Sequence, residues 1–303
     1  MDLPSPLERA PGGLYDGLPL FLKREDAHEL GAFKWRGALP TIDAYKARGA
    51  AAVVTASTGN HGAAVAWASR RLGLRAMVYA PAGASLSKLA MIDGLGAEIR
   101  LAGTDLDFAK DEGRRFAAEA QVPFFEDGAE PTQFEGYGVI AEEILDQMAE
   151  PPAAVVVPVG NGALVAGIGR TLKRRSPATL VVGVVAREAP VMAWSFGAKH
   201  PVECGQMATF ADGLAVRVAI PEAVEAVNAV VDRMLLVSER EMAHALGAYA
   251  RAGIRAEGAA ASALAALPQI SDASGPVVAV VTGRNIDDDL HRRAVAQPES
   301  FPE

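Results

Sequence analysis

Short runs of apolar and β-branched residues recur along the chain, and longer alanine-rich segments separate them. The runs are apolar at nearly every position instead of alternating with polar residues, which is typical of strands that helices cover on both faces. We expect buried strands over residues 51–55, 76–80, 98–102, 155–159, 180–185, 234–237 and 277–281.

The alanine-rich segments predict helices of ordinary globular length, because alanine has the highest helix propensity. We expect these helices over residues 62–72, 85–95, 105–120, 138–148, 164–173, 239–252 and 258–267. The alternation of buried strands with helices predicts an α/β fold with mostly parallel sheets.

The order of these elements indicates two domains. Residues 51–127 contain strand and helix units of their own, and the proline-rich stretch 150–152 marks a later loop. The first fifty residues come before that segment and must therefore pack with the later half of the chain. We expect a discontinuous large domain, residues 1–50 and 128–303, with a small α/β domain, residues 51–127, inserted in it.

Composition and charge argue against several classes of partner. The 303 residues carry 37 acidic and 29 basic side chains, a net charge of -8, without a basic stripe that would bind nucleic acid or an anionic membrane. Cys204 is the single cysteine, which excludes an internal disulfide and favours a cytoplasmic location. The N-terminus does not resemble a signal peptide, and prolines and glycines interrupt residues 151–169, the most apolar stretch, so we expect no membrane segment.

Three of the expected strands are followed by turns of small and polar residues. The turns cover residues 57–62, 160–164 and 282–285. In a parallel sheet such turns lie at the carboxyl edge, where free backbone N–H groups and helix N-termini attract anions. We therefore expect a ligand site at this edge.

The second turn, Gly-Asn-Gly-Ala-Leu over residues 160–164, is the best phosphate cradle of the three. It carries a single short polar side chain, so backbone amides can approach an oxyanion closely. It lacks the Gly-Lys-Ser/Thr ending of a triphosphate site, and the glycines at 160, 162 and 167 miss the GxGxxG spacing of dinucleotide folds. A plain helix start is the alternative for this turn taken by itself.

The first turn carries Ser57, Thr58 and Asn60, whose hydroxyl and amide groups suit a carboxylate and a phenolate-like oxygen. The alternative is a cluster of helix-capping residues, because Ser, Thr and Asn are preferred at N-caps. We expect the ring of His61 to pack beneath the turn. For Thr282 in the third turn, the alternative to ligand binding is likewise capping, in this case of the last helix.

A lysine lies between two aromatic residues in the stretch Gly-Ala-Phe-Lys-Trp. If Lys34 turned inward with Phe33 and Trp35, its amine would be partly desolvated and the neutral form favoured, as imine formation and proton abstraction require. A solvent-facing lysine is the alternative. A phosphate cradle, an oxyanion-binding turn and an imine-forming lysine in one α/β chain together indicate pyridoxal phosphate as the cofactor.

Six motifs occur in one order along nearly the whole chain. They are LKREDAHELGAFKWRGA, TASTGNHGAAVAWASRRLG, VPVGNGALVAGI, ADGLAV, AEGAAASALAAL and VVTGRNID. This set resembles the fold type II pyridoxal-phosphate enzymes of the threonine/serine dehydratase and serine racemase family. The resemblance implies two open, twisted, mostly parallel sheets flanked by helices, similar to the tryptophan synthase β-subunit.

The resemblance also implies roles for the candidate residues. Lys34 would bind the cofactor aldehyde covalently, Phe33 would pack beside the cofactor, and Asn60 would hydrogen-bond its ring hydroxyl. Thr282 would meet the pyridine nitrogen, where a hydroxyl makes the ring a milder electron sink than a carboxylate would and so suits β-elimination. The phosphate would be held by Gly160, Asn161, Gly162, Ala163 and Leu164. The substrate carboxylate would be received by Ser57, Thr58, Gly59, Asn60 and His61.

Several positions depart from the family pattern. Ala32 stands where a serine is usual. Thr58, the second candidate catalytic residue, stands where racemases have the serine that acts on the opposite face of the substrate, which argues against racemisation. Asn161 and Ala163 make the phosphate turn similar to that of threonine synthases. Val185 replaces a metal-binding glutamate, so we expect no metal site of that kind.

Arg284 replaces a glycine in the last motif and adds a cation there. Two roles are open for it. The guanidinium would either select an extra anionic group on the substrate or pair outward with Asp287 or Asp288.

The activity that the resemblance implies is that of an ammonia-lyase. Such an enzyme converts a small hydroxy amino acid, such as L-threonine or L-serine, to a 2-oxo acid and ammonia, with Lys34 removing the Cα proton. The family also implies a homodimer. The alternatives are replacement chemistry as in threonine synthase or cysteine synthase, serine racemisation and, from another class, a nicotinamide-dependent oxidoreductase or a nucleotide-binding sensor.

Overall fold

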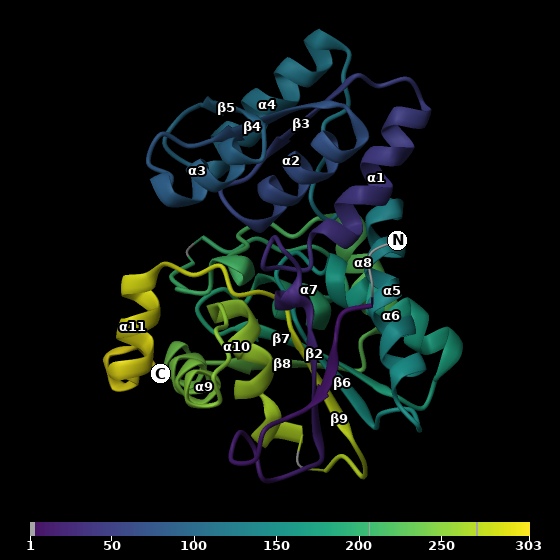
Figure 1. The fold of residues 1–303 in the computed structure, drawn as a ribbon, viewed down its shortest axis with the longest axis vertical. Helices are drawn as coiled ribbons and strands as arrows, with labels where there is room; N and C mark the ends of the chain where they lie inside the picture. The colour runs from purple at the N-terminus through teal and green to yellow at the C-terminus, as the bar shows by residue number, and fades with distance from the viewer. Residues whose placement is uncertain (1–3, 206, 271) are drawn as a thin grey trace. The chain divides into compact units, whose positions relative to one another are not determined.

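A computed structural model describes residues 4–205, 207–270 and 272–303. The chain forms two compact units (Figure 1). Unit 1 comprises Met1–Phe33 and Tyr137–Glu303, and unit 2 comprises the continuous segment Lys34–Gly136. Each unit has a sheet of its own.

Unit 1 is built on a six-stranded sheet in the order β1-β2-β9-β6-β7-β8. Its strands are β1 (Leu7–Arg9), β2 (Leu20–Arg24), β6 (Ala154–Pro158), β7 (Leu180–Ala186), β8 (Arg233–Val237) and β9 (Val277–Val281). Only β1 runs antiparallel to its neighbour; the other pairs are parallel. Every residue of β6 and β9 is buried, as the continuous apolar runs predicted.

Helices cover both faces of this sheet. They are α6 (Ala163–Arg175), α7 (Val191–Ala198), α8 (Pro221–Val230), α9 (Glu239–Arg251), α10 (Gly258–Ala265) and α11 (Asp288–Ala296), with the later part of α5 (Pro131–Gln147). Helices α9 and α10 share a core with Val156, Val182 and Ala279. Helix α6 lies against the other face, where Gly169 approaches Val181. The strands therefore contact helices on both sides.

A buried ion pair joins β2 to helix α5 in unit 1. The side chain of Lys23 is fully buried, and its Nζ atom donates to Glu143 Oε2 at 2.6 Å and to the carbonyl oxygen of Ser5 at 2.7 Å. A buried ammonium without such partners would be strongly unfavourable. The pair explains why a strand with two basic residues lies inside the protein.

Unit 2 contains a parallel sheet of β3 (Ala52–Ala56), β4 (Arg75–Ala80) and β5 (Glu98–Leu101), in that order. Its helices are α1 (Trp35–Ala47), α2 (Asn60–Leu72), α3 (Leu86–Gly94) and α4 (Leu106–Ala120), seen in the purple to blue part of Figure 1. Helix α4 packs on the face formed by Val54, Met77 and Tyr79. Helix α2 packs on the opposite face, where Gly62 lets Val78 approach closely.

The α/β fold with mostly parallel sheets is confirmed, and each of the seven expected strands is present within one or two residues of its expected ends. Strands β1 and β2 and helices α1, α7 and α8 were not predicted, and the last helix, α11, was expected without stated bounds. The units divide at residues 33/34 and 136/137, where 50/51 and 127/128 were expected. The first boundary lies earlier than expected because α1 packs against α2, with the rings of Trp35 and Trp67 edge to face at 6.2 Å. In the described part of the chain, every helix is too short or too polar to cross a membrane.

Candidate functional site

The phosphate turn of unit 1 lies between β6 and α6. Gly162 is the N-cap of α6 and has a φ of 95°, a left-handed conformation that favours glycine. A Cβ atom on Gly160 would lie 2.4 Å from the carbonyl oxygen of Gly213, so position 160 also requires glycine. The side chain of Asn161 accepts a hydrogen bond from the Ala163 amide at 3.1 Å. The turn is thus a stretch of main chain with two required glycines at the start of a helix, as a phosphate cradle requires.

Thr282 follows β9 directly and is 2% exposed. Among the residues that the structure describes, its Oγ1 atom has no hydrogen-bond partner. Capping does not explain it, because α11 begins six residues later and its first turn is capped by the Asp287 side chain. A buried hydroxyl without a partner is unfavourable by about 1–3 kcal/mol, which points to a ligand atom that completes it.

The segment before Lys34 is paired with the segment that contains Thr282. The Phe33 amide donates to the Thr282 carbonyl at 3.0 Å, and Ala32 forms an antiparallel bridge with Gly283. The Phe33 ring packs edge to face on Tyr137, with centroids 5.0 Å apart. Two expected cofactor residues, Phe33 and Thr282, are therefore brought together within unit 1.

Glu257 is a buried carboxylate beside Gly283, and it was not among the predicted site residues. It is 3% exposed, and a Cβ atom on Gly283 would lie 2.7 Å from its Oε1 atom. Its amide also donates to the Gly283 carbonyl at 2.9 Å. The signal in the sequence was an acidic residue at the start of an otherwise apolar alanine-rich helix, α10.

Among the described residues, Arg284 does not take the second role left open from the sequence, which was an outward pair with Asp287 or Asp288. Its Nη1 atom donates to the carbonyl oxygen of Asp26 at 2.6 Å. Asp288 is paired with Arg255 at 2.6 Å, and Asp287 caps α11. The guanidinium thus ties the last turn of unit 1 to the segment after β2.

The candidate carboxylate-binding turn of unit 2, Ser57 to His61, follows β3 and leads into α2. The N-cap of α2 is Gly59, and among the described residues this position has no side-chain cap hydrogen bond. The Ser57 hydroxyl accepts a hydrogen bond from the Gly59 amide at 3.2 Å and so stabilises the turn itself. Capping therefore does not account for the cluster of polar residues in this turn.

Lys34 immediately precedes α1 and forms an ion pair within unit 2. Its Nζ atom donates to Asp127 Oδ2 at 2.5 Å, and the two side chains are 15% and 25% exposed. The side chain of Lys34 is therefore turned inward and partly desolvated, and the group that faces its amine is a carboxylate that the aromatic neighbours did not indicate. The solvent-facing alternative does not describe it.

Asp127 is held in place by Gln133, a fully buried residue of α5. Gln133 Nε2 donates to Asp127 Oδ1 at 2.6 Å, and Gln133 Oε1 accepts from the Gly128 amide at 2.7 Å. Gln133 thus donates to one carboxylate oxygen of Asp127 and Lys34 donates to the other. This arrangement fixes the direction in which the carboxylate faces the lysine.

The position of Asp127 follows from the sheet of unit 2. Residues 123–125 pair with β3: the Val54 amide donates to the Pro123 carbonyl at 2.9 Å, and the Phe125 amide donates to the Val54 carbonyl at 2.7 Å. Val54 and Phe124 form a parallel bridge, so both segments end at the same edge. Asp127 therefore comes to lie near the turn that follows β3. In the sequence, residues 122–128 form an apolar run that ends in Glu-Asp-Gly, which could have indicated a polar residue at the end of a strand.

His61 lies beneath the turn, as expected, and is 6% exposed. Its ring packs edge to face on Phe125 at 4.8 Å. The Thr55 hydroxyl donates to the Phe125 carbonyl, so at the 3.0 Å contact between His61 Nε2 and Thr55 Oγ1 the imidazole is the donor. The Nδ1 atom then faces Asp127 Oδ1 at 3.6 Å.

Two shifted pKa values describe the charges in this group. Burial lowers the pKa of His61, which favours the neutral ring. Burial by itself would raise the pKa of Asp127, but the charge of Lys34, the proximity of His61 and the hydrogen bonds from Lys34 and Gln133 outweigh it and hold the pKa well below its usual range. Asp127 is therefore a carboxylate at neutral pH.

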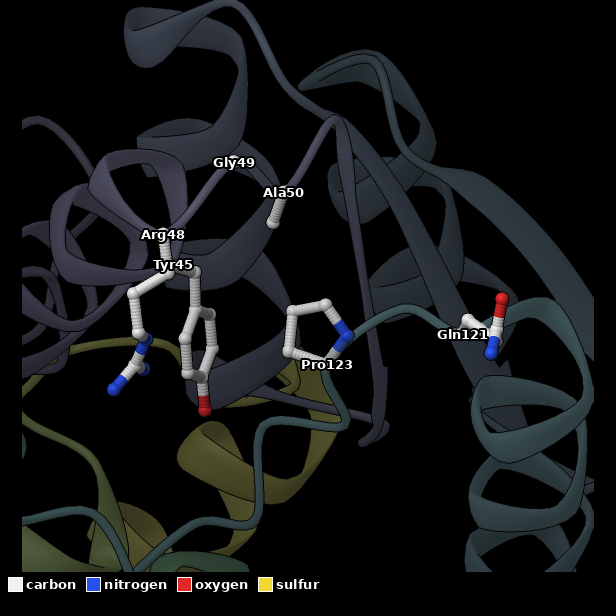
Figure 2. Close-up of a pocket in the computed structure, with 6 residues that line it drawn as sticks. All are labelled: Tyr45, Arg48, Gly49, Ala50, Gln121 and Pro123. Carbon is white, nitrogen blue, oxygen red and sulfur yellow. The ribbon is translucent and has the colours of Figure 1, made fainter.

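A cavity of about 240 Å³ opens elsewhere in unit 2 and contains none of these residues. Its lining residues are Tyr45, Arg48, Gly49, Ala50, Gln121 and Pro123. Figure 2 shows the Tyr45 ring between the Arg48 guanidinium and the Pro123 ring, and the Tyr45 hydroxyl donates to Glu130 at 2.6 Å. It holds no candidate nucleophile, because the tyrosine hydroxyl is already engaged.

Comparisons with known proteins agree with the motifs and the fold. A family model described as pyridoxal-phosphate dependent enzyme matches residues 2–283. The chain is 33% identical over 275 residues to the L-threonine ammonia-lyase of Geobacter sulfurreducens, covering 89% of this chain and 68% of that protein. It is 34% identical over 282 residues to the L-threonine ammonia-lyase of Thermotoga maritima, covering 92% and 70%.

Solved structures give the same result. Threonine deaminase isoform 2 from Solanum lycopersicum superposes with a TM-score of 0.92 at 28% identity, over 97% of this chain and 88% of that chain. A second solved threonine deaminase, from T.th., gives a TM-score of 0.88 at 29% identity, over 94% of both chains. Matching sequence, motif order and fold lead to one conclusion: the chain belongs to the family of pyridoxal-phosphate dependent enzymes.

Proposed function

We propose that the chain is a pyridoxal-phosphate dependent ammonia-lyase that converts a small hydroxy amino acid, such as L-threonine or L-serine, to a 2-oxo acid and ammonia. The relatives named above support the reaction class. The observation that carries the proposal is the buried Thr282 hydroxyl without a partner in the described part of the chain. A neutral group of this kind can meet a pyridine nitrogen without forcing its protonation, which suits elimination.

Two features of unit 1 fit this cofactor. The main-chain turn at Gly160 and Gly162 leaves no space for side-chain atoms and would hold the phosphate through backbone amides. Thr282 would complete its hydrogen bonding with the ring nitrogen. Phe33, whose amide is bonded to Thr282, is joined by one peptide bond to Lys34, which would bind the aldehyde.

The chemistry is then divided between the cofactor and the protein. When bound, pyridoxal phosphate delocalises the negative charge that develops on the substrate Cα atom. Lys34 would take the Cα proton, since its amine becomes available once the substrate amine has replaced it. The hydroxyl and amide groups of Ser57, Thr58 and Asn60 would bind the substrate carboxylate, and Thr58 is the second candidate acid or base.

The experiment is a spectroscopic titration followed by a substrate screen. The purified protein should become coloured with pyridoxal phosphate, and borohydride should remove the colour and fix the cofactor on Lys34. Lys34→Ala should abolish both the colour and the release of 2-oxo acid from L- and D-hydroxy amino acids. A protein that stays colourless would contradict the whole proposal. Turnover of only phosphate-ester or acetyl-ester substrates would indicate that the enzyme catalyses replacement and not elimination.

We further propose a cytoplasmic homodimer. The single cysteine, Cys204, suits a reducing compartment, and the family of the relatives suggests the assembly. Sedimentation equilibrium of the holoenzyme should give twice the mass of the chain. A monomer at working concentration would contradict the dimer without affecting the proposed reaction.

A further inference from the structure

We propose that Asp127 is the positioning residue of Lys34: it holds the amine whenever the lysine is not bonded to the cofactor, and it stabilises the positive charge that the amine acquires when it takes the substrate proton. The inference rests on the proposed function, in which Lys34 is the base.

The contacts of Asp127 support a single orientation. Its Oδ2 atom accepts from Lys34 at 2.5 Å, while its Oδ1 atom accepts from Gln133 at 2.6 Å. Gln133 is fully buried and is itself fixed by the Gly128 amide. Because the far oxygen is held by a buried amide, the near oxygen keeps its direction when Lys34 leaves it. The carboxylate is therefore a fixed point to which the flexible lysine returns.

The charges around the pair suit this role. His61, beneath the turn, faces the pair, and Glu126, next to Asp127 along the chain, acts in turn on His61. Glu126 is engaged elsewhere, by Lys110 at 2.9 Å and Arg114 at 2.5 Å, and the buried His61 is favoured in its neutral form. Lys34 is therefore a cation in direct contact with the charge of Asp127.

The proton transfer involves only the substrate and Lys34. The lone pair of Lys34 Nζ forms the new N–H bond, the Cα–H bond breaks, and its electron pair stays on the substrate. Asp127 remains ionised throughout, since it accepts a hydrogen bond from the new ammonium and takes no proton. An ammonium in contact with a carboxylate is favoured over the neutral amine, so the pair makes proton removal more favourable.

This role predicts opposite effects on two measurements when the carboxylate becomes an amide. In Asp127→Asn, Lys34 no longer has to leave a charged partner, so the rate at which pyridoxal phosphate forms the coloured imine with apo protein at neutral pH should rise by about 3- to 10-fold. The same change should lower kcat by about 10- to 100-fold, because the ammonium formed by proton transfer loses the carboxylate that accepts its hydrogen bond. A merely structural role would lower both quantities together.

The controls separate this inference from the proposed function. Asp111→Asn removes a carboxylate that pairs with Arg114 on the exposed face of α4 and should change neither measurement. Asp127→Glu keeps the charge and should recover part of kcat. If the wild-type protein forms the imine but Asp127→Asn slows both imine formation and turnover, or changes neither, the inference is overturned while the proposed function stands. If the wild-type protein forms no imine, the proposed function itself fails.

Discussion

The carbonyl oxygen of Gly213 lies 2.4 Å from the position that a Cβ atom on Gly160 would occupy. The two glycines are far apart in the sequence, and the loop that carries Gly213 is held by a third element. Glu239, the first residue of α9, accepts hydrogen bonds from the Phe210 amide at 2.8 Å and the Thr209 hydroxyl at 3.2 Å. The shape of the phosphate turn therefore depends on a loop that is itself tied to a helix.

Gly160→Ala should damage both stability and cofactor binding. The added methyl group meets a main-chain carbonyl that cannot rotate away, so the free energy of unfolding should fall by about 1–3 kcal/mol. Urea unfolding of the apo protein and a titration with pyridoxal phosphate measure the two effects. Gly197→Ala, where no atom lies within 4 Å of the new methyl group, is the matched control and should lower neither. Unchanged cofactor affinity in Gly160→Ala would contradict the assignment of the turn.

Thr282→Val should separate stability from binding. The hydroxyl is buried without a partner among the described residues, so its replacement by a methyl group should raise the stability of the apo protein by about 1 kcal/mol. The affinity for pyridoxal phosphate should fall, because the ring nitrogen loses its contact. Thermal unfolding of the apo protein and cofactor titration test the two parts. A loss of apo stability would show that Thr282 already has a partner within the protein.

Lys23→Met should be strongly destabilising although it places an apolar residue in a core. It leaves the Glu143 carboxylate, 12% exposed, without its ammonium, and breaking a pair of this kind typically lowers the free energy of unfolding by about 3–5 kcal/mol. The double variant Lys23→Met with Glu143→Gln should regain part of that loss. Chemical denaturation of the three proteins gives the comparison, and an additive double variant would refute the coupling.

Glu239→Gln should stabilise the protein at neutral pH. Burial raises the pKa of Glu239, although the hydrogen bonds from Phe210 and Thr209 oppose the shift. Folding therefore favours the protonated acid, so the ionised side chain lowers stability above that pKa, and this penalty disappears as the pH falls through it. The amide keeps the acceptor for Phe210 and carries no charge.

The test is urea unfolding of this variant and the wild type at pH 7 and at pH 5. The advantage of Glu239→Gln should be larger at pH 7. Glu222→Gln, on the exposed first turn of α8, is the control and should shift stability by less than about 0.5 kcal/mol at either pH. A variant less stable than the wild type at pH 7 would show that the carboxylate charge supports the loop.

The buried parallel strands could be predicted from the sequence because their apolar runs need no knowledge of distant residues. Strand β2 could not, since its Lys23 is buried only by virtue of Glu143, 120 residues further along the chain. Helix α1 contains Pro40 and depends on packing against α2. Both elements are specified by tertiary contacts rather than by local pattern.

The candidate site divides in the same way. Thr282 and the two polar turns were found because each follows a recognisable strand, and Lys34 was found because two aromatic residues flank it. Asp127 was not found, because its meaning depends on the pairing of residues 123–125 with β3, which no local periodicity reveals. The aromatic neighbours of Lys34 suggested an inward, partly desolvated amine, but they could not indicate the carboxylate that faces it.

Lys34, Asp127 and Gln133 all belong to unit 2, which is one uninterrupted stretch of chain from Lys34 to Gly136. The lysine and the groups that orient it are therefore inherited as a single block of coding sequence. A recombination event with a related gene at the two ends of this block would transfer the base together with its counter-ion, whereas a crossover inside it would separate them and yield a chimaera whose lysine lacks its carboxylate.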